Sequence, residues 1–354
     1  MFKNIAVFGT GALGGHVAAY LAQNNHRVTV IDAWPENIDR IKSHGITLQG
    51  LTDAECFTAS PTAALHLTEV QELKASPGFD IVFLAVKSYD TLWATTMMAD
   101  YLAPSGFVVS LQNAINEERI AGVAGWGRTV GCIASKIVVE LTGPGHVARY
   151  VAKGDAKHTV FRVGECHGRV TPRVTQIADM LSVCDSAKTT TNLWGERWTK
   201  LAVNCMRNSL TAATGRGGNA NDRDPTTRQV GIRLCGEVLA VAQAHGIVLE
   251  KAYGIAPEDA IAAAGGDMAA MARCEDVIIS AIGQRSDAAR SSMGQDVAKG
   301  RRTEIDYLNG YVVEKAKDVG LHAPVNAAMT EIVRSVEAKR LTPSPDVVAG
   351  LSQS

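Results

Sequence analysis

Several features that mark metal-binding, disulfide-bonded or secreted proteins are missing from this sequence. The seven cysteines are odd in number and form no CxxC pair, and the nine histidines show neither an HxH nor an HExxH spacing. A disulfide framework or a zinc site would need such patterns. We therefore expect reduced thiols and no metal cofactor, with the adjacent Cys166 and His167 in a structural role.

Charge of one sign and long apolar runs are also lacking. The formal net charge is −1, and no block of like charges occurs. A chain this close to neutral does not bind nucleic acid or an anionic membrane through bulk electrostatics. No apolar run approaches the length that spans a bilayer, and the first residues read as a strand rather than a signal peptide. We expect a cytoplasmic protein without nucleic-acid or membrane partners.

The most unusual stretch that is present is a predicted helix from Leu193 to Gly215. Apolar residues recur in it at steps of three and four and occupy other faces too, which is typical of a buried helix. Lys200, Asn204 and Asn208 nevertheless follow one another at four-residue spacing, so they form one polar stripe. Because buried ammonium and amide groups need partners, the stripe predicts one wall of a substrate site. The alternative is a half-exposed helix whose lysine reaches solvent.

A glycine-rich turn stands between two predicted strands near the N-terminus. Residues 3–8 read as a strand, residues 18–22 as part of a helix, and residues 27–31 as a second strand. The turn GTGALG fits GxGxxG in the context of a dinucleotide-binding fold. In that motif the glycines serve the tight turn, the approach of the pyrophosphate and the packing of helix on strand. The cofactor contacts we expect are Gly9, Gly11, Ala12, Leu13 and Gly14.

Asp32, at the end of the second strand, indicates which cofactor to expect. A carboxylate there accepts hydrogen bonds from the adenosine ribose hydroxyls and repels a 2′-phosphate. Arg40 and Lys42 follow, but no arginine comes directly after Asp32. NAD(H) is therefore predicted over NADP(H). The alternative is that Asp32 only caps the next helix.

Two polar residues follow further predicted strands. Lys87 comes after a strand at residues 80–86, and Asn113 comes after a strand at residues 107–112. The carboxyl ends of parallel strands face the ligand crevice, so both side chains should lie near the cofactor.

The length of 354 residues predicts two domains. Residues 137–151 read as a hairpin around a Thr-Gly-Pro-Gly turn, and a strand at 158–163 and a helix at 171–183 follow. The polar segment 188–192 is expected to connect the domains. We predict a Rossmann domain of residues 1–190.

The second half reads differently, as an all-helical domain of residues 191–354. Residues 217–225 are expected to form a loop, with helices from there to about Lys339. Thr303 would open one of these helices and place Glu304 in its first turn, where the helix dipole favours a carboxylate. Ser291 and Ser292 suit helix N-caps.

Six motifs make the chain resemble the ketopantoate reductase family. They follow the family's order through nearly the whole chain: GTGALGG (9–15), AVKSYDT (85–91), SLQNAINEE (110–118), WTKLAVNCMRNSLTAATG (198–215), SSMGQDVAKGRRTEIDYLNG (291–310) and GLHAPVN (320–326). The resemblance implies a Rossmann domain joined to a helical domain, with a 2-keto acid reduced in the cleft between them. It also implies a homodimer.

The resemblance assigns catalysis to two residues. Lys200 matches the proton donor to the carbonyl oxygen, and Glu304 matches the acid that orients the substrate hydroxyl. The chemistry suits these residue types, since hydride transfer to a ketone leaves negative charge on oxygen, which an ammonium stabilises and protonates. Five further positions match binding residues: Asn204, Asn208 and Ser292 for the substrate, Lys87 for the cofactor, and Asn113 for both.

The sequence departs from the family at Asp32, where a basic residue that suits NADPH is usual, and at Ala114, where glycine is usual. The segments 216–225 and 260–272 are also expected to lengthen the second half and to reshape the pocket. Asp32 favours an NAD-dependent branch that acts on D-2-hydroxy acids such as mandelate. Two alternatives remain open: a dehydrogenase of a larger or neutral secondary alcohol, and a dinucleotide sensor without turnover.

Overall fold

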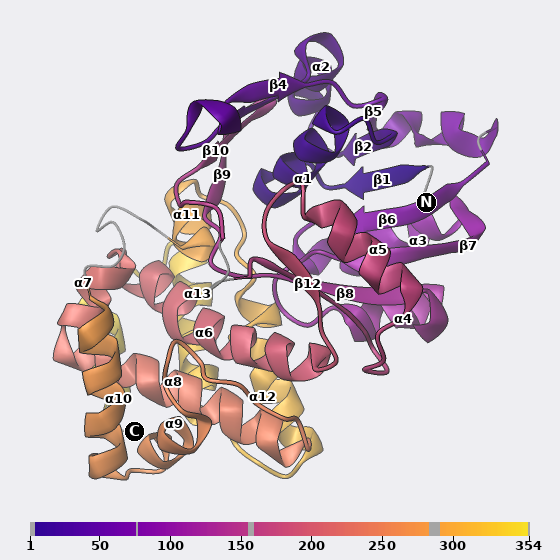
Figure 1. The fold of residues 1–354 in the computed structure, drawn as a ribbon. Helices are drawn as coiled ribbons and strands as arrows, with labels where there is room; N and C mark the ends of the chain where they lie inside the picture. Colours follow the sequence, from indigo (N-terminus) through magenta and orange to yellow (C-terminus); the bar gives the residue numbers. More distant parts are fainter. Residues whose placement is uncertain (1–3, 76, 155–158, 283–290, 353–354) are drawn as a thin grey trace. The chain divides into compact units, whose positions relative to one another are not determined.

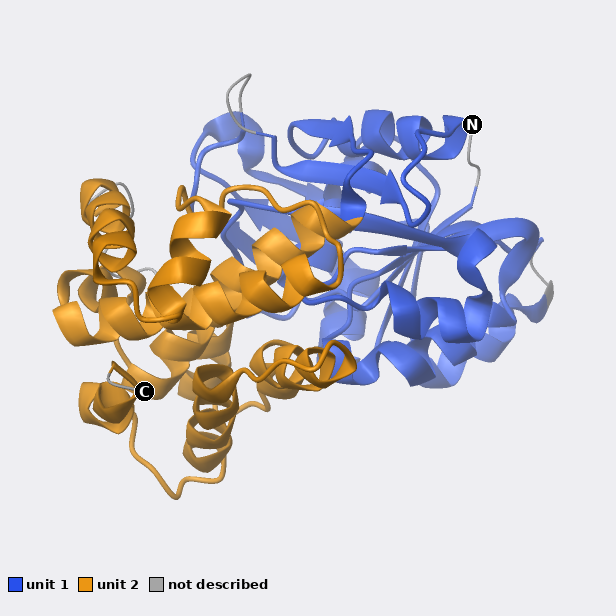
Figure 2. Ribbon diagram, turned by 90° about the horizontal axis from the view of Figure 1, so that it is seen from below, with its two compact units in different colours: residues 1–193 blue, residues 194–354 orange. Residues whose placement is uncertain are grey.

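The computed structural model describes residues 4–75, 77–154, 159–282 and 291–352 (Figure 1). Lys3, His158 and Arg290, which belong to segments discussed above, lie outside the described residues. The chain divides into two compact units, Met1–Leu193 and Trp194–Ser354 (Figure 2). The sequence placed this division at residue 190.

Eight strands form the main sheet of unit 1, in the order β12-β11-β8-β7-β6-β1-β2-β5. Six of them are parallel, whereas β11 pairs antiparallel with β8 and β12 runs parallel to β11. The strand order reverses between β1 and β6, and such switch points are where open α/β sheets bind ligands. The strands are β1 Ile5–Phe8, β2 Val28–Asp32, β5 Ala63–His66, β6 Phe79–Leu84, β7 Leu102–Ser110, β8 Thr129–Ala134, β11 Phe161–Glu165 and β12 Ala187–Thr189.

Strand residues alternate between two apolar layers, one on each face of this sheet. Ile5 and Val7 pack into one layer and Ala6 and Phe8 into the other, as the two-residue period of a strand requires. Helices α1 and α5 belong to the first layer, and α3 and α4 belong to the second. The helices are α1 Ala12–Gln23, α2 Pro35–His44, α3 Thr91–Ala99, α4 Glu117–Ala124 and α5 Pro172–Leu181, with short 3₁₀ turns η1 Asp53–Glu55, η2 Leu67–Ala75, η3 Ser88–Asp90 and η4 Trp126–Arg128.

A second, smaller sheet of order β4-β3-β10-β9 packs on α1. The predicted hairpin is confirmed, since β9 (Val139–Gly143) and β10 (His146–Arg149) pair antiparallel. The sequence did not reveal β3 (Ile46–Gln49), which pairs parallel with β10, or β4 (Phe57–Ala59). A Cβ on Gly15 of α1 would lie only 3.0 Å from Val147 Cγ2, so this sheet and α1 are closely packed.

Unit 2 is helical, as predicted. Its elements in the described part of the chain are α6 Leu193–Thr214, α7 Gly218–Arg223, α8 Pro225–Ala244, α9 Pro257–Ala264, α10 Met268–Ala281, α11 Ser292–Ala298, η5 Ile305–Tyr307, α12 Asn309–Asp318, α13 Pro324–Glu337 and η6 Pro345–Ser352. Units 1 and 2 together confirm the predicted fold class, an α/β Rossmann domain followed by a helical domain. None of the helices in the described ranges is both long and apolar enough to cross a bilayer.

Three local predictions were wrong. Lys188 belongs to β12, an edge strand with a single partner, rather than to a connecting segment. Residues 218–223 of the expected loop form α7, because side-chain contacts to α6 and α8 hold this glycine- and asparagine-rich segment in helical form. Glu304 precedes a 3₁₀ turn instead of entering an α-helix, since the backbone breaks at Leu308 (φ −104°, ψ −94°) before α12 begins.

Candidate functional site

The glycine-rich turn between β1 and α1 has the geometry of a dinucleotide loop. Gly9 has φ +93°, and a Cβ there would lie 2.7 Å from the Val86 nitrogen. A Cβ on Gly14 would lie 2.0 Å from the Gly9 carbonyl oxygen. These two glycines are therefore needed by the fold itself, for the turn and for close packing.

Gly11 differs from both. Its φ is −65°, and a Cβ built on it meets nothing within 4 Å. The protein alone thus gives no steric reason for glycine at this position. Gly11 is the N-cap of α1, and Ala12 and Leu13 form the first turn, where backbone N–H groups lack helical partners. Such an open helix N-terminus suits a phosphate group.

The Asp32 side chain is tied to this loop. Its Oδ2 accepts hydrogen bonds from the Thr10 backbone N–H at 2.5 Å and from the Thr10 hydroxyl at 2.7 Å. Its Oδ1 accepts from the Trp34 N–H at 2.9 Å, and Trp34 is the N-cap of α2. A carboxylate offers about four acceptor positions in total, so one position on Oδ1 remains. Asp32 therefore supports the next helix and keeps a negative edge available.

Asn37, which the sequence gave no reason to select, completes the support of the loop. It is fully buried on α2, and its Nδ2 donates to the Thr10 hydroxyl at 2.9 Å. Its Oδ1 accepts from the Gly145 N–H at 2.7 Å in the β9–β10 turn. Thr10 is thus held from two sides, by Asp32 and by Asn37. Lys42 is engaged elsewhere, with Glu69 at 2.5 Å.

Lys87 and Asn113 lie on neighbouring segments at the carboxyl ends of β6 and β7. Both are half-buried, and Lys87 directly follows Val86, whose nitrogen abuts Gly9. Buried Asn116 joins the two segments, because its Nδ2 donates to the Asn113 carbonyl at 2.8 Å and to the Ser88 hydroxyl at 3.1 Å. Unit 1 therefore brings Lys87 and Asn113 to the edge of the sheet that carries the glycine loop.

The backbone conformation at Ala114 is one that suits glycine. Its φ is +63°, in the left-handed region that is strained for residues with a Cβ. The alanine is buried and retains a conformation that glycine adopts freely.

The polar stripe of α6 is present in unit 2. Lys200, Asn204 and Asn208 are half-buried, whereas most of the surrounding helix is fully buried. Most of the helix is thus buried, as predicted, and the face that carries the stripe is partly open. The Nδ2 of Asn204 is itself buried, yet it has no hydrogen-bond partner in the described part of the chain. An unsatisfied buried amide is costly and calls for a bound partner.

Ser292 stands beside the end of the stripe. Ser291 is the N-cap of α11, and its hydroxyl accepts from the Gly294 N–H at 3.2 Å. Ser291 is also hydrogen-bonded to Thr211, whose hydroxyl donates to the Asn208 carbonyl at 2.9 Å. Ser291 thus acts as a structural cap, and the adjacent Ser292 is half-buried at the first position of α11.

Glu304 is buried and forms the N-cap of η5. The following segment packs on α6, since the rings of Tyr311 and Trp198 lie 5.9 Å apart. A hydrogen bond of 2.9 Å from Asn309 Nδ2 to Asn326 Oδ1 anchors this segment to α13. Unit 2 therefore brings the Glu304 segment beside the half of α6 that carries Lys200.

Asn326 in turn depends on Glu237 of α8. The Glu237 carboxylate accepts from the Val325 and Asn326 N–H groups, both at 2.9 Å, and from Asn326 Nδ2 at 2.8 Å. Burial raises the pKa of the Glu237 carboxyl. No local pattern in the sequence pointed to Glu237, because its partners lie about a quarter of the chain away.

No group of three or more histidine, cysteine, aspartate or glutamate side chains in the described ranges is arranged to hold a metal ion. The seven cysteines, all among the described residues, are free thiols, and five of them are buried.

Two family profiles match the chain. Residues 5–161 match "Ketopantoate reductase PanE/ApbA", and residues 192–337 match "Ketopantoate reductase PanE/ApbA C terminal". A curated 2-dehydropantoate 2-reductase from Archaeoglobus fulgidus is 27% identical over 340 residues, which cover 95% of this chain and 98% of that relative.

Solved structures agree with these matches. A PanE/ApbA family ketopantoate reductase from Ralstonia eutropha is 26% identical, with a TM-score of 0.75 over 95% of this chain and 99% of that one. A ternary structure of D-mandelate dehydrogenase with NADH and anilino(oxo)acetate is 22% identical and shares the fold, with a TM-score of 0.77 over 95% and 98% of the two chains. The profiles, the curated relative and the fold agree, and this chain is an oxidoreductase of the ketopantoate reductase family.

Proposed function

We propose that this chain catalyses reversible hydride transfer between NAD(H) and a 2-keto or 2-hydroxy acid, with Lys200 as the general acid and base. The observation that carries the proposal is the unsatisfied Nδ2 of Asn204, one helical turn from Lys200 on the same face of α6. A carbonyl or hydroxyl oxygen of a substrate would supply the missing acceptor. A helix that served only to pack would have no use for this amide.

In the reducing direction, the Lys200 ammonium donates a hydrogen bond to the carbonyl oxygen and then transfers a proton to it as negative charge develops. Asn204 and Asn208 orient the substrate along α6, and Ser292 donates to its carboxylate. Glu304 accepts from the substrate hydroxyl that forms. Bound NADH supplies the hydride.

For the cofactor, the proposal assigns the pyrophosphate to the open N-terminus of α1 at Gly11, Ala12 and Leu13. Gly9 and Gly14 shape that turn. Asp32 offers its remaining Oδ1 acceptor position to a ribose hydroxyl, and its negative charge disfavours a 2′-phosphate. NAD is therefore the proposed cofactor, with NADP second. Lys87 and Asn113 would contact the cofactor from the ends of β6 and β7.

Dinucleotide turnover tests the proposal directly. Purified protein is assayed with NAD(H) and NADP(H) in parallel, against ketopantoate, pantoate and a panel of 2-hydroxy acids that includes mandelate. We expect NAD-linked turnover of at least one acid. NADPH-linked ketopantoate reduction would overturn the cofactor assignment, and turnover of neutral alcohols alone would overturn the substrate class.

The proposal places the enzyme in the cytoplasm as a homodimer, following its family resemblance. Light scattering of the purified protein measures the assembly state, and a monomer at micromolar concentration would contradict the homodimer.

A further inference from the structure

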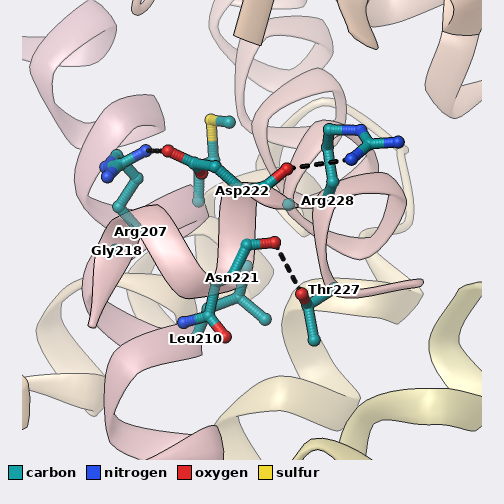
Figure 3. A pocket seen from close by; sticks show the side chains of 9 residues that line it. Arg207, Leu210, Gly218, Asn221, Asp222, Thr227 and Arg228 are labelled. Atoms are coloured by element: carbon teal, nitrogen blue, oxygen red, sulfur yellow. Dashed lines mark hydrogen bonds and ion pairs between the residues drawn. The ribbon is translucent and has the colours of Figure 1, made fainter. Parts of the chain in front are cut away.

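We infer that Arg207 is an additional substrate-binding residue, which recognises the carboxylate and makes the site selective for acids. This inference rests on the proposed function. Few basic residues are identifiable from the sequence as a carboxylate clamp, and Arg207 is not among the site residues that the sequence predicted. Its position becomes informative only when α6 and its neighbours are seen together (Figure 3).

Arg207 lies on the same face of α6 as the polar stripe. At about 100° per residue, its Cα is rotated only about 20° from that of Lys200 and lies about 10 Å further along the helix axis. Asn204 precedes Arg207 by three residues, and Asn208 follows it directly. Like them, it is half-buried. The Arg207 Cα therefore lies on the side of α6 that carries the stripe, at the end nearer to Thr211, which is hydrogen-bonded to Ser291.

The guanidinium is fixed from two sides. Its Nη1 pairs with Asp222 Oδ2 of α7 at 2.5 Å, and its central carbon lies 4.4 Å from the centre of the Tyr253 ring. The side chains of Arg207 and Asp222 are 10% and 7% exposed, so the pair is largely removed from water. The Tyr253 hydroxyl also donates to Asp222 Oδ2, at 3.4 Å. A side chain held in this way loses little entropy when it binds a ligand.

The remaining donors are uncommitted. Nη2 lies against Gly218, where an added Cβ would come within 2.3 Å of it, so glycine at 218 makes room for this rotamer. Nε and Nη2 donate to no atom in the described part of the chain, and neither is among its fully buried, unpaired atoms. The cavity under the pair measures about 10 Å³, which holds one water at most. A carboxylate would therefore approach from the open face of the stripe.

The chemistry matches the proposed substrate. A 2-keto acid carries its carboxylate next to the carbonyl, and Arg presents paired N–H donors that fit carboxylate geometry. Along α6, Lys200 would serve the carbonyl end, while Arg207 and Ser292 would serve the carboxylate end. Because Asp222 neutralises part of the positive charge, Arg207 would select for an acid through directed hydrogen bonds more than through long-range attraction.

The test compares acids with their neutral counterparts. Arg207→Met keeps the apolar length of the side chain and removes the donors. With the 2-hydroxy acid that the wild type oxidises best, we expect KM to rise at least tenfold while kcat changes less than threefold. With the corresponding amide or methyl ester, KM should change less than twofold. Arg207→Lys should recover only part of the acid preference, because a single ammonium cannot replace the paired donors.

Arg216→Met is the matched control, since Arg216 is 45% exposed and its Nη1 pairs with Asp224 Oδ2 at 3.5 Å. It should leave acid and ester kinetics unchanged. Because Arg207→Met leaves the largely buried Asp222 carboxylate without this partner, we expect a lower melting temperature in any case. A role confined to this pairing would affect acid and ester kinetics alike, and that result would overturn the inference.

Calorimetric binding of oxamate, an unreactive mimic of a 2-keto acid, separates this inference from the proposed function. Measured with NADH present and absent, oxamate affinity should fall at least tenfold in Arg207→Met. If the wild type turned over no acid but showed this loss, the proposed reaction would fail and the carboxylate contact would stand. Equal oxamate affinity in both proteins, or no binding to the wild type, would overturn the contact.

Discussion

Asp32 Oδ2 accepts hydrogen bonds from both the backbone N–H and the hydroxyl of Thr10, so the end of β2 and the glycine turn after β1 are joined through one carboxylate oxygen. The residue that we propose discriminates between cofactors therefore also supports the loop that binds them. Substitutions at Asp32 will change both properties unless they preserve the shape of the side chain.

Asp32→Asn is the substitution that separates the two roles. Asparagine can keep its one acceptor oxygen on the two Thr10 donors and preserves the size of the side chain. It gives up the acceptor of the Trp34 N–H and removes the charge that repels a 2′-phosphate. We expect the ratio of kcat/KM for NAD to that for NADP to fall at least tenfold. Thr10→Val, the control, loosens the loop and keeps the charge, so it should raise KM for both cofactors by a similar factor. An unchanged ratio in Asp32→Asn would refute the assignment.

The glycines of the turn should respond differently to alanine. In Gly11→Ala the new Cβ meets no protein atom and φ is already favourable, so the melting temperature should stay within about 2 °C, while Kd for NADH rises at least tenfold. Gly9→Ala meets the Val86 nitrogen at a φ of +93° and should lose about 1–3 kcal/mol of stability. Calorimetry and fluorescence titration measure the two effects. Normal NADH affinity in Gly11→Ala would argue that the pyrophosphate does not lie there.

Lys200→Met should lower kcat sharply and leave cofactor binding intact. Loss of a general acid that also stabilises the oxyanion lowers kcat by about 10²–10⁴-fold. Lys251→Met, which removes an exposed lysine after α8, is the matched control and should keep full activity. Stopped-flow measurement of the hydride step gives the rate. Near-normal turnover in Lys200→Met would mean that another group donates the proton.

His16 should make the folded state sensitive to acid. Burial, with the charges of Arg149 and Lys153, lowers its pKa from 6.5 to about 3. Between these two pH values the unfolded chain binds a proton that the folded chain does not, so the free energy of unfolding falls as the pH drops below 6.5. One histidine contributes at most about 1.4 kcal/mol per pH unit in this window and nothing above it.

The comparison for His16 uses urea unfolding at pH 7.5 and pH 5. Neither ring nitrogen has a hydrogen-bond partner among the described residues, so phenylalanine can replace the ring without stranding another polar group. Between pH 7.5 and pH 5, the free energy of unfolding of His16→Phe should fall by about 1–2 kcal/mol less than that of the wild type. His44→Gln, at an exposed position, should match the wild type. Equal losses in all three proteins would show that His16 titrates normally.

The parts of the fold that the sequence predicted are those with strong local signals. The β1–α1–β2 start combines a strand pattern, a glycine turn and a helix pattern within about thirty residues, and α6 has an unbroken helical period. By contrast, α7 is short and rich in glycine and asparagine. Its helical form depends on the pairing of Asp222 with Arg207, fifteen residues earlier, and composition alone indicates a loop there.

The candidate site divides in the same way. Lys200, Asn204 and Asn208 were found because one helix presents them at a fixed spacing. Arg207 lies on the same side of this helix, seven residues after Lys200, but its importance depends on Asp222, Tyr253 and Gly218, which come from other elements. Asn37 and Glu237 act through backbone groups far along the chain, and Asn116 reaches the hydroxyl of Ser88 on another segment. Such partners leave no trace in a local pattern.

The small sheet on α1 also sets an order for biosynthesis. β3 leaves the ribosome roughly a hundred residues ahead of β10, its parallel partner, and such long-range pairing is slow to form. Until residue 149 has emerged, the outer side of α1, including Gly15, has neither Val147 nor the Asn37–Gly145 hydrogen bond against it. A nascent chain that already contains the complete GxGxxG turn therefore exposes apolar helix surface to chaperones. The β9–β10 hairpin, which lies outside the β1–α1–β2 motif, is the segment that covers this surface.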